Sequence, residues 1–185
     1  RIVSRACGSG AGFLTDKPRS TIRMTLRVYD TRSRKKREFS PLKEGRVSMY
    51  VCGITPYSPS HLGHARCYLV FDVVHRWLEA RGYEVDYVQN FTDIDDKILN
   101  ISESEGVNYS VVSNRNIEDY FEVMDAMNVL RADHYPRVTE TIPEIIDMIS
   151  NLQEKGHAYV GGDGVYFEID TAPEKYGQLT GQTLE

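Results

Sequence analysis

A strand, a loop marked by two prolines, a helix and a second strand follow one another between residues 47 and 90, and this order restricts the fold more than any other feature. Residues 47–52 (VSMYVC) form a nearly continuous apolar run, typical of a strand buried on both faces. Apolar residues repeat at helical spacing from Val70 to Trp77, and we expect this helix to end at Gly82. Residues 83–90 (YEVDYVQN) indicate another strand. The sequence therefore predicts an α/β fold containing a βαβ unit, with parallel strands and a right-handed crossover.

Composition excludes several classes of protein. The 185 residues are 41% apolar and 26% charged, as in an ordinary globular protein, and the net charge of −5 argues against a chain that binds nucleic acid over its whole surface. No run approaches the roughly 18 apolar residues of a membrane span, so we expect no membrane association. The three cysteines form no CxxC pair, which indicates a reducing compartment. The basic run at residues 32–37 is predicted to be a solvated turn, with an RNA-facing role as the alternative.

The first 25 residues differ from the rest and are predicted to be an extension. They carry five basic residues against the single acidic Asp16, with Ser, Thr and Gly between them, and the first methionine is Met24. This bias resembles an organelle transit segment, which would place the protein in a chloroplast or mitochondrion. The alternative is upstream sequence ahead of a start at Met24, with a cytoplasmic protein.

Beyond residue 98 the pattern becomes mainly helical. Four apolar residues lie on one predicted helical face: Ile117, Tyr120, Phe121 and Met124. A second helix is expected from about Thr141 to Lys155. A hairpin with its tip at residues 161–164 should follow. The change in pattern predicts a division into residues 26–112 and 113–185.

The segment His61-Leu62-Gly63-His64 stands at the start of the first predicted helix. Two histidines three residues apart are weak evidence for zinc, and many such pairs are core or surface residues. Their position favours a third interpretation, because ligands of open α/β sheets bind where a strand ends and a helix begins. Two imidazoles there can donate hydrogen bonds to phosphate oxygens, and Gly63 lets a nucleotide approach the backbone. We therefore expect nucleotidyl-transfer chemistry.

Two motifs together resemble a known family. The segment MYVCGITPYSPSHLGHAR, followed by YVQNFTDIDDKI, closely resembles cysteinyl-tRNA synthetase, a class I aminoacyl-tRNA synthetase, and His61 to His64 is similar to its His-Ile-Gly-His signature. The resemblance extends over roughly residues 26–185. It implies a Rossmann-like nucleotide-binding half-domain over residues 26–112, followed by the start of an α+β connective insertion. It also implies that the intact enzyme activates cysteine with ATP and Mg²⁺ and transfers it to tRNA(Cys).

The resemblance assigns further roles. His61 and His64 would be catalytic and, with Leu62 and Gly63, would bind ATP, while an amino-acid pocket is implied at Gly53, Thr55 and Thr92. Cys52 would bind zinc, whose preference for a substrate thiolate explains the rejection of serine. From the residues alone, a small buried side chain is the favoured interpretation of Cys52, and the alternative for Thr92 is a strand-end hydroxyl that bonds the local backbone. Asp93, Asp95 and Asp96 are expected to cap the next helix rather than contact substrate.

The sequence also departs from the family. A Lys-Met-Ser-Lys-Ser loop and three further zinc ligands, which the family carries downstream, have no counterpart here. We therefore expect an N-terminal part of a synthetase that is inactive alone. Two alternatives stay open: the cysteine ligase of mycothiol synthesis, which has a similar fold, and a truncated non-catalytic paralogue. Monomer and homodimer also both stay open.

Overall fold

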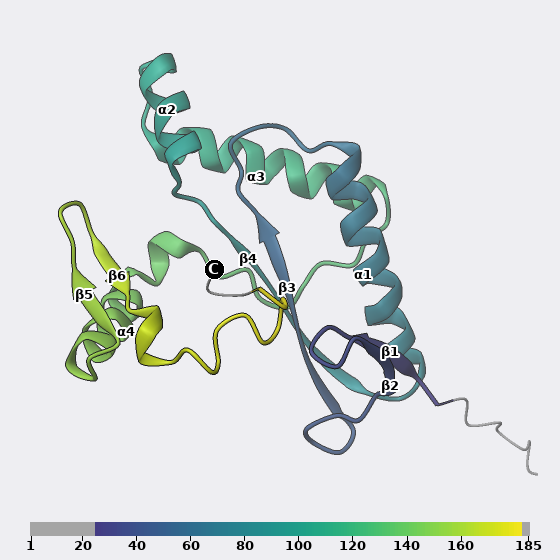
Figure 1. Ribbon diagram of the computed structural model, residues 1–185. Coiled ribbons are helices and arrows are strands. Elements are labelled where there is room, and N and C mark those ends of the chain that lie inside the picture. Colours follow the sequence, from purple (N-terminus) through teal and green to yellow (C-terminus); the bar gives the residue numbers. More distant parts are fainter. Residues whose placement is uncertain (1–24, 183–185) are drawn as a thin grey trace, which may run out of the picture.

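The computed structural model describes residues 25–182 (Figure 1). The predicted extension therefore lies outside the described residues, apart from Thr25. The elements are β1 (Arg27–Asp30), β2 (Lys35–Glu38), β3 (Arg46–Ile54), α1 (Leu62–Ala80), β4 (Glu84–Phe91), α2 (Asp96–Glu105), α3 (Tyr109–Ala126), α4 (Ile142–Glu154), β5 (Ala158–Val160) and β6 (Val165–Phe167), with short 3₁₀ turns at Val138–Glu140 and Ile169–Thr171.

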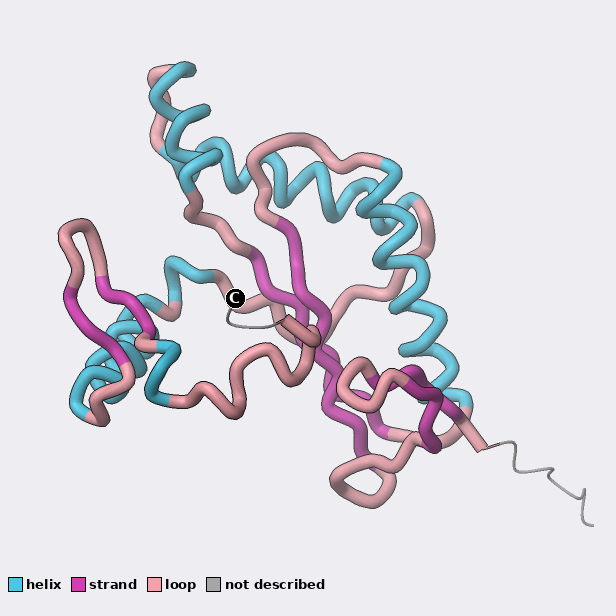
Figure 2. Tube along the Cα trace, viewed as in Figure 1, coloured by secondary structure: helices cyan, strands magenta, loops and turns pink. Residues whose placement is uncertain are grey.

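The predicted βαβ unit is confirmed. Strands β3 and β4 pair in parallel from Arg46 opposite Glu84 to Ile54 opposite Phe91, and α1 forms the connection between them. Helix α1 ends as expected, with Gly82 in the left-handed region at a φ of 86°. The two strands lie side by side in Figure 2, with the loop to α1 leaving at the carboxyl end of β3. The residue pattern between 47 and 90 was thus sufficient to predict this unit.

A third segment extends the sheet on the far edge of β4. The Gln89 amide donates to the His134 carbonyl at 3.0 Å, and the Phe91 amide donates to the Pro136 carbonyl at 2.9 Å. Parallel bridges join Val88 to His134 and Phe91 to Arg137. Strand β4 is therefore central in the described part of the chain, and the connection back to this third segment runs through α2 and α3.

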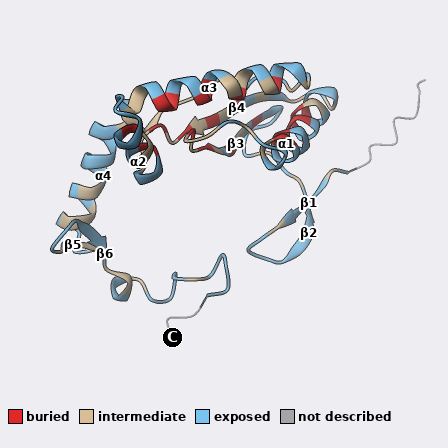
Figure 3. Cartoon of the chain, turned by 90° about the horizontal axis from the view of Figure 1, so that it is seen from above, coloured by how far each residue is buried: buried red, intermediate tan, exposed pale blue. Residues whose placement is uncertain are grey.

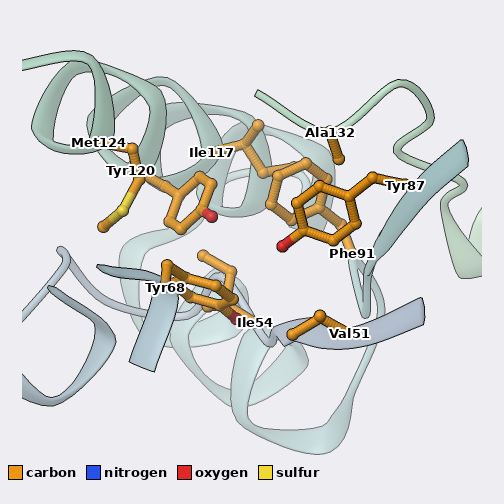
Figure 4. Close-up of a cluster of buried hydrophobic side chains, with 9 residues drawn as sticks. All are labelled: Val51, Ile54, Tyr68, Tyr87, Phe91, Ile117, Tyr120, Met124 and Ala132. Atoms are coloured by element: carbon orange, nitrogen blue, oxygen red, sulfur yellow. The ribbon is translucent and has the colours of Figure 1, made fainter. Parts of the chain in front are cut away.

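One face of this sheet carries the core. Its buried cluster takes side chains from β3, β4, α1, α3 and the segment after α3 (Figure 4): Val51, Ile54, Tyr68, Tyr87, Phe91, Ile117, Tyr120, Met124 and Ala132. The aromatic rings meet edge to face, with ring centroids 5.3 Å apart for Tyr68 and Tyr120 and 5.6 Å for Phe91 and Tyr120. The predicted apolar face of α3 is thereby confirmed. Both helices cover the same side of the sheet.

The burial predicted for β3 is wrong. Along β3, the buried Val47 and Val51 alternate with the exposed Ser48 and Tyr50, so only one face of the strand is covered in the described residues. On α1, the apolar residues that repeat from Val70 to Trp77 face outward, with Val73 65% exposed. The helix instead buries Ala65, Tyr68, Asp72, His75 and Leu78.

The buried polar residue Asp72 explains which face of α1 turns inward. Its carboxylate accepts from the Leu130 amide at 2.9 Å and from Arg76 Nε at 2.8 Å, while Arg76 also donates to the Asn128 carbonyl at 2.6 Å. These bonds join α1 to the segment that follows α3. A buried carboxylate is tolerated when its oxygens are paired in this way. The helix is therefore oriented by polar contacts as well as by apolar burial.

The two ends of the described chain form hairpins outside the core (Figure 3). Strands β5 and β6 pair from Ala158 opposite Phe167 to Val160 opposite Val165, and α4 begins after Thr141 and ends before Lys155, both as predicted. The basic run at 32–37 forms the exposed turn and second strand of the β1–β2 hairpin, which the sequence did not predict as strands. None of residues 141–182 is buried.

The division between a nucleotide-binding part and an insertion stays a prediction. The boundary expected between residues 112 and 113 falls inside α3, a continuous helix. Ile117, Tyr120 and Met124 of the same helix pack in the core with β3 and β4. Among the described helices, none has the length and hydropathy needed to cross a membrane.

Candidate active site

Strand β3 ends in an irregularity that shapes the candidate site. Val51 is paired with Gln89 and Ile54 with Phe91, so Cys52 and Gly53 together oppose the single residue Asn90. A Cβ at Gly53 would lie 1.4 Å from the Asn90 carbonyl oxygen. Only glycine allows this approach of the two strands. Bulges of this kind change the direction in which side chains leave a sheet.

Asn90 is a site residue that sequence reasoning missed. Its Oδ1 accepts from the Gly53 amide at 2.9 Å and from the Tyr50 hydroxyl at 2.9 Å. Its Nδ2 faces the Thr92 hydroxyl at 3.5 Å. Asn90 thereby joins two residues of the predicted amino-acid pocket, Gly53 and Thr92. The sequence could have indicated Asn90, because it is a polar residue at the carboxyl end of a predicted parallel strand.

Thr92 and Thr55, the other two residues predicted for the amino-acid pocket, lie near Gly53. The Thr92 amide donates to the Ile54 carbonyl at 3.0 Å, which holds the ends of the two strands together. Thr55 is half-buried in the loop after β3, and its carbonyl accepts from the Tyr57 amide at 2.9 Å. Gly53, Thr55 and Thr92 therefore all lie at the carboxyl edge of β3 and β4. Their role in a pocket stays a prediction.

The histidine pair forms the amino-terminal cap of α1. His61 Nδ1 accepts from the Gly63 amide at 3.0 Å, and His64 Nδ1 accepts from the His61 amide at 3.4 Å. The two bonds form a reciprocal capping box in which imidazoles take the place of the usual hydroxyl and carboxylate. The rings stack with centroids 3.8 Å apart and an interplanar angle of 17°. Both rings are therefore held by contacts among residues 61–64, within the first turn of α1.

This cap determines the tautomer of both rings. A ring nitrogen that accepts a hydrogen bond carries no proton, so each neutral imidazole holds its proton on Nε2. His61 is exposed and His64 half-buried, and among residues 25–182 neither Nε2–H group has a hydrogen-bond partner, so both can donate to a ligand. Beside them is the amino end of a 19-residue helix, which favours negative charge. The arrangement suits phosphate oxygens.

His64 is biased toward this neutral form. Partial burial penalises the charged ring, and the adjacent His61 adds repulsion, so the pKa of His64 lies below its ordinary value. Leu62 and Gly63 are exposed between the two rings. A Cβ at Gly63 would lie 2.8 Å from the His61 ring, so the glycine leaves room for the ring stack. Its role in access by a nucleotide stays a prediction.

The lowered pKa of His64 predicts a pH effect on stability. The unfolded chain takes up the proton near its ordinary value of 6.5, whereas the folded chain does so only at lower pH. Stability from this group is therefore complete above about pH 6.5 and is lost as the pH falls below it. His64→Gln keeps a capping acceptor without the titration. The thermal midpoint should fall more between about pH 7.5 and pH 5.5 in the parent than in His64→Gln. Equal falls would contradict the capping role of the neutral ring.

Cys52 is accessible. Its side chain is exposed, so the prediction of a small buried residue is wrong. Cys67 on α1 is exposed as well. The Cys52 carbonyl accepts from the Tyr68 hydroxyl at 3.2 Å, which fixes the backbone next to the thiol. In the part of the chain that the structure describes, no group of three or more His, Cys, Asp or Glu side chains could hold a metal ion. Cys52 therefore fits zinc as a single ligand and not as a complete site.

The three aspartates after β4 have separate roles. Asp95 caps α2, because its side chain accepts from the Lys97 amide at 2.8 Å. Asp96 lies in the first turn of the helix, as expected. Asp93 does not cap α2: it is 3% exposed and accepts from the Thr139 amide at 3.0 Å and hydroxyl at 2.6 Å. It anchors the segment that extends the sheet.

Comparison with known proteins agrees with this geometry. The family model of the tRNA synthetases class I (C) catalytic domain matches residues 38–185. Cysteine–tRNA ligase of Pyrococcus horikoshii is 52% identical over 88% of this chain, and that of Dehalococcoides mccartyi is 49% identical over 86%. These matches cover 34% and 35% of the two relatives, so the chain spans about a third of their length.

A solved structure shows the same fold. Methionyl-tRNA synthetase of Mycobacterium tuberculosis, in complex with methionyl-adenylate, has a TM-score of 0.56 with this chain at 19% identity, covering 62% of this chain and 23% of that one. The matching family model and the fold together define a class I aminoacyl-tRNA synthetase catalytic domain of the Rossmann-like α/β type. More specifically, the chain belongs to the family of the tRNA synthetases class I (C) catalytic domain.

Proposed function

We propose that this chain forms the nucleotide-binding part of an enzyme that activates cysteine with ATP and attaches it to tRNA(Cys). The observation that carries the proposal is the histidine pair, whose two Nδ1 atoms are occupied by backbone amides at the start of α1. The names of the curated relatives support cysteine as the amino acid. The rest of such an enzyme would lie outside this chain.

The proposed chemistry assigns a distinct task to each group. The cysteine carboxylate attacks the α-phosphorus of ATP, and the bond from that phosphorus to the bridging oxygen breaks to release pyrophosphate. Negative charge builds on the phosphate oxygens during this step. The Nε2–H donors of His61 and His64 would stabilise it, aided by the amino end of α1. Gly53, Thr55 and Thr92 would line the cysteine subsite, and Mg²⁺ would accompany ATP.

Zinc is part of the proposal through Cys52. A thiolate is a soft ligand that zinc accepts, and the exposed side chain leaves room for an ion beside the carboxyl edge of the sheet. The remaining ligands would come from outside the described residues. Bound zinc would recognise the thiol of the substrate cysteine, a group that serine lacks.

The proposal is tested with the complete protein that contains this chain. We expect pyrophosphate exchange that depends on cysteine, followed by attachment of cysteine to tRNA(Cys). Exchange that depends on cysteine without charging of tRNA would indicate a ligase with another acceptor, as in mycothiol synthesis. No exchange with cysteine would refute the proposal and favour a non-catalytic paralogue.

Cys52→Ser separates the zinc role from simple packing. Serine has nearly the same volume but a harder, largely protonated ligand atom, so zinc content and cysteine activation should both fall. Selection of cysteine over serine should weaken as well. Zinc content and the ratio of cysteine to serine activation are measured on one preparation of the complete protein. Cys67→Ser, which also changes an exposed cysteine, is the control. Full zinc with an unchanged ratio in Cys52→Ser would exclude the ligand role.

A further inference from the structure

The loop between β3 and the histidine pair is held from outside the βαβ unit. Residues 55–60 connect Ile54 to His61, and two side chains of α3 bond its backbone. Asn116 Nδ2 donates to the Pro56 carbonyl at 3.1 Å, and an Asp119 carboxylate oxygen accepts from the Ser60 amide at 2.7 Å. Both bonds join residues about 60 positions apart in the sequence. They fix the loop near its beginning and at its end.

The helix that supplies these two side chains is itself firmly placed. Asn116 is 3% exposed, and its Nδ2 also donates to the Val112 carbonyl of its own helix at 2.9 Å. The neighbouring Ile117 and Tyr120 are part of the buried core cluster shown in Figure 4. Helix α3 therefore offers a rigid support, and the position of the loop depends on where the core places that helix.

The bond from the Ser60 amide to Asp119 acts one residue before the histidine pair. Ser60 directly precedes His61, the cap residue of α1, and the amide of His61 is the donor that fixes His64. A shift of the chain at Ser60 would turn the His61 amide away and release the ring of His64. The bond to Asp119 thus controls the entry of the chain into the helix on which both rings depend.

We infer that Asn116 and Asp119 are positioning residues for the adenylation step. Helix α3 acts on the reaction through the loop at residues 55–60, by holding His61 and His64 where their Nε2–H groups meet the phosphates in the transition state. This inference rests on the proposed function. It assigns a role in cysteine activation to a helix that provides neither of the two histidines.

The test compares three variants of the complete protein. Asp119→Ala removes the acceptor for the Ser60 amide, Asp119→Asn keeps an acceptor oxygen at the same place, and Glu118→Gln changes an exposed carboxylate on the same helix. Cysteine-dependent pyrophosphate exchange is measured per active site, after titration of active sites by the burst of adenylate. If Asp119 only stabilised the fold, its replacement would lower the number of active sites and leave the exchange rate per active site unchanged.

Misplacement of the rings should lower kcat rather than weaken ground-state binding. For Asp119→Ala we expect kcat to fall on the order of 10- to 100-fold. Its KM for cysteine should change by less than about twofold, and Asp119→Asn should keep kcat within about threefold of the parent. Asn116→Leu, which has a similar size and lacks the amide donor, should show the same loss of kcat and serves if Asp119→Ala does not fold.

Two results would overturn the inference. One is a kcat for Asp119→Ala equal to that of Glu118→Gln. The other is a kcat for Asp119→Asn as low as that of Asp119→Ala. Absence of cysteine-dependent exchange in the parent protein would refute the proposed function, and the inference with it.

Discussion

Alanine at Gly53 should destabilise the protein by on the order of 3 kcal/mol or more. The added Cβ would lie 1.4 Å from the Asn90 carbonyl oxygen, and that oxygen belongs to the backbone of the central strand. Relief requires β3 to move away from β4, and this movement breaks the bond from the Gly53 amide to Asn90 Oδ1. The free energy of unfolding in urea measures the loss.

Gly162→Ala is the matched control for this change. Gly162 lies at the tip of the β5–β6 hairpin, and a Cβ there would meet nothing within 4 Å. This variant should unfold at nearly the urea midpoint of the parent. Equal midpoints for Gly53→Ala and Gly162→Ala would show that the strands at the bulge can separate without cost. The proposed pocket at Gly53 and Thr92 would then lose its structural basis.

The local part of the fold could be predicted because its signals are local. Strand, loop, helix and strand in sequence order define a parallel pair, and glycine at residue 82 ends the helix between them. Helix α4 and the β5–β6 hairpin could also be predicted. Pro143 marks the start of the helix, and the glycines at residues 161–164 mark the tip of the hairpin. The β1–β2 hairpin was not, because its strands are short and the second is entirely polar.

The inward face of α1 could not be predicted from apolar spacing. The stripe from Val70 to Trp77 is apolar but exposed, whereas the buried face includes Asp72 and His75. Asp72 is turned inward by its bond to the Leu130 amide, which is 58 residues away in the sequence. Such a contact depends on how α3 and the chain after it return to the sheet. No periodicity within α1 carries that information.

The same limit applies to the candidate site. His61 and His64 could be singled out because their signal, two histidines three residues apart at the start of a helix, lies within one helical turn. Asn90 was missed because its contact with the Gly53 amide crosses 37 residues, and Asp119 was missed because its contact with Ser60 crosses 59. The groups proposed to contact substrate could therefore be predicted from a local sequence motif. The groups that hold them in place became visible only in the folded chain.

Alanine at His61 or His64 should slow adenylate formation much more than it weakens cysteine binding. Each Nε2–H donor interacts most strongly with the charge that develops on phosphate oxygens, so its loss raises the barrier by on the order of 2–4 kcal/mol. His61→Ala also removes the acceptor for the Gly63 amide, so it should lower stability as well. His64→Ala leaves that bond in place.

The central claim is that this histidine pair binds ATP phosphates during cysteine activation. Its most direct test is the single-turnover rate of cysteinyl-adenylate formation in the complete protein, measured for the parent, His64→Ala and His157→Ala. His157 bonds Thr171 next to the β5–β6 hairpin and serves as the control. The account predicts the parental rate for His157→Ala and a rate on the order of 10²- to 10³-fold lower for His64→Ala. Adenylate formation at the parental rate in His64→Ala would contradict the claim.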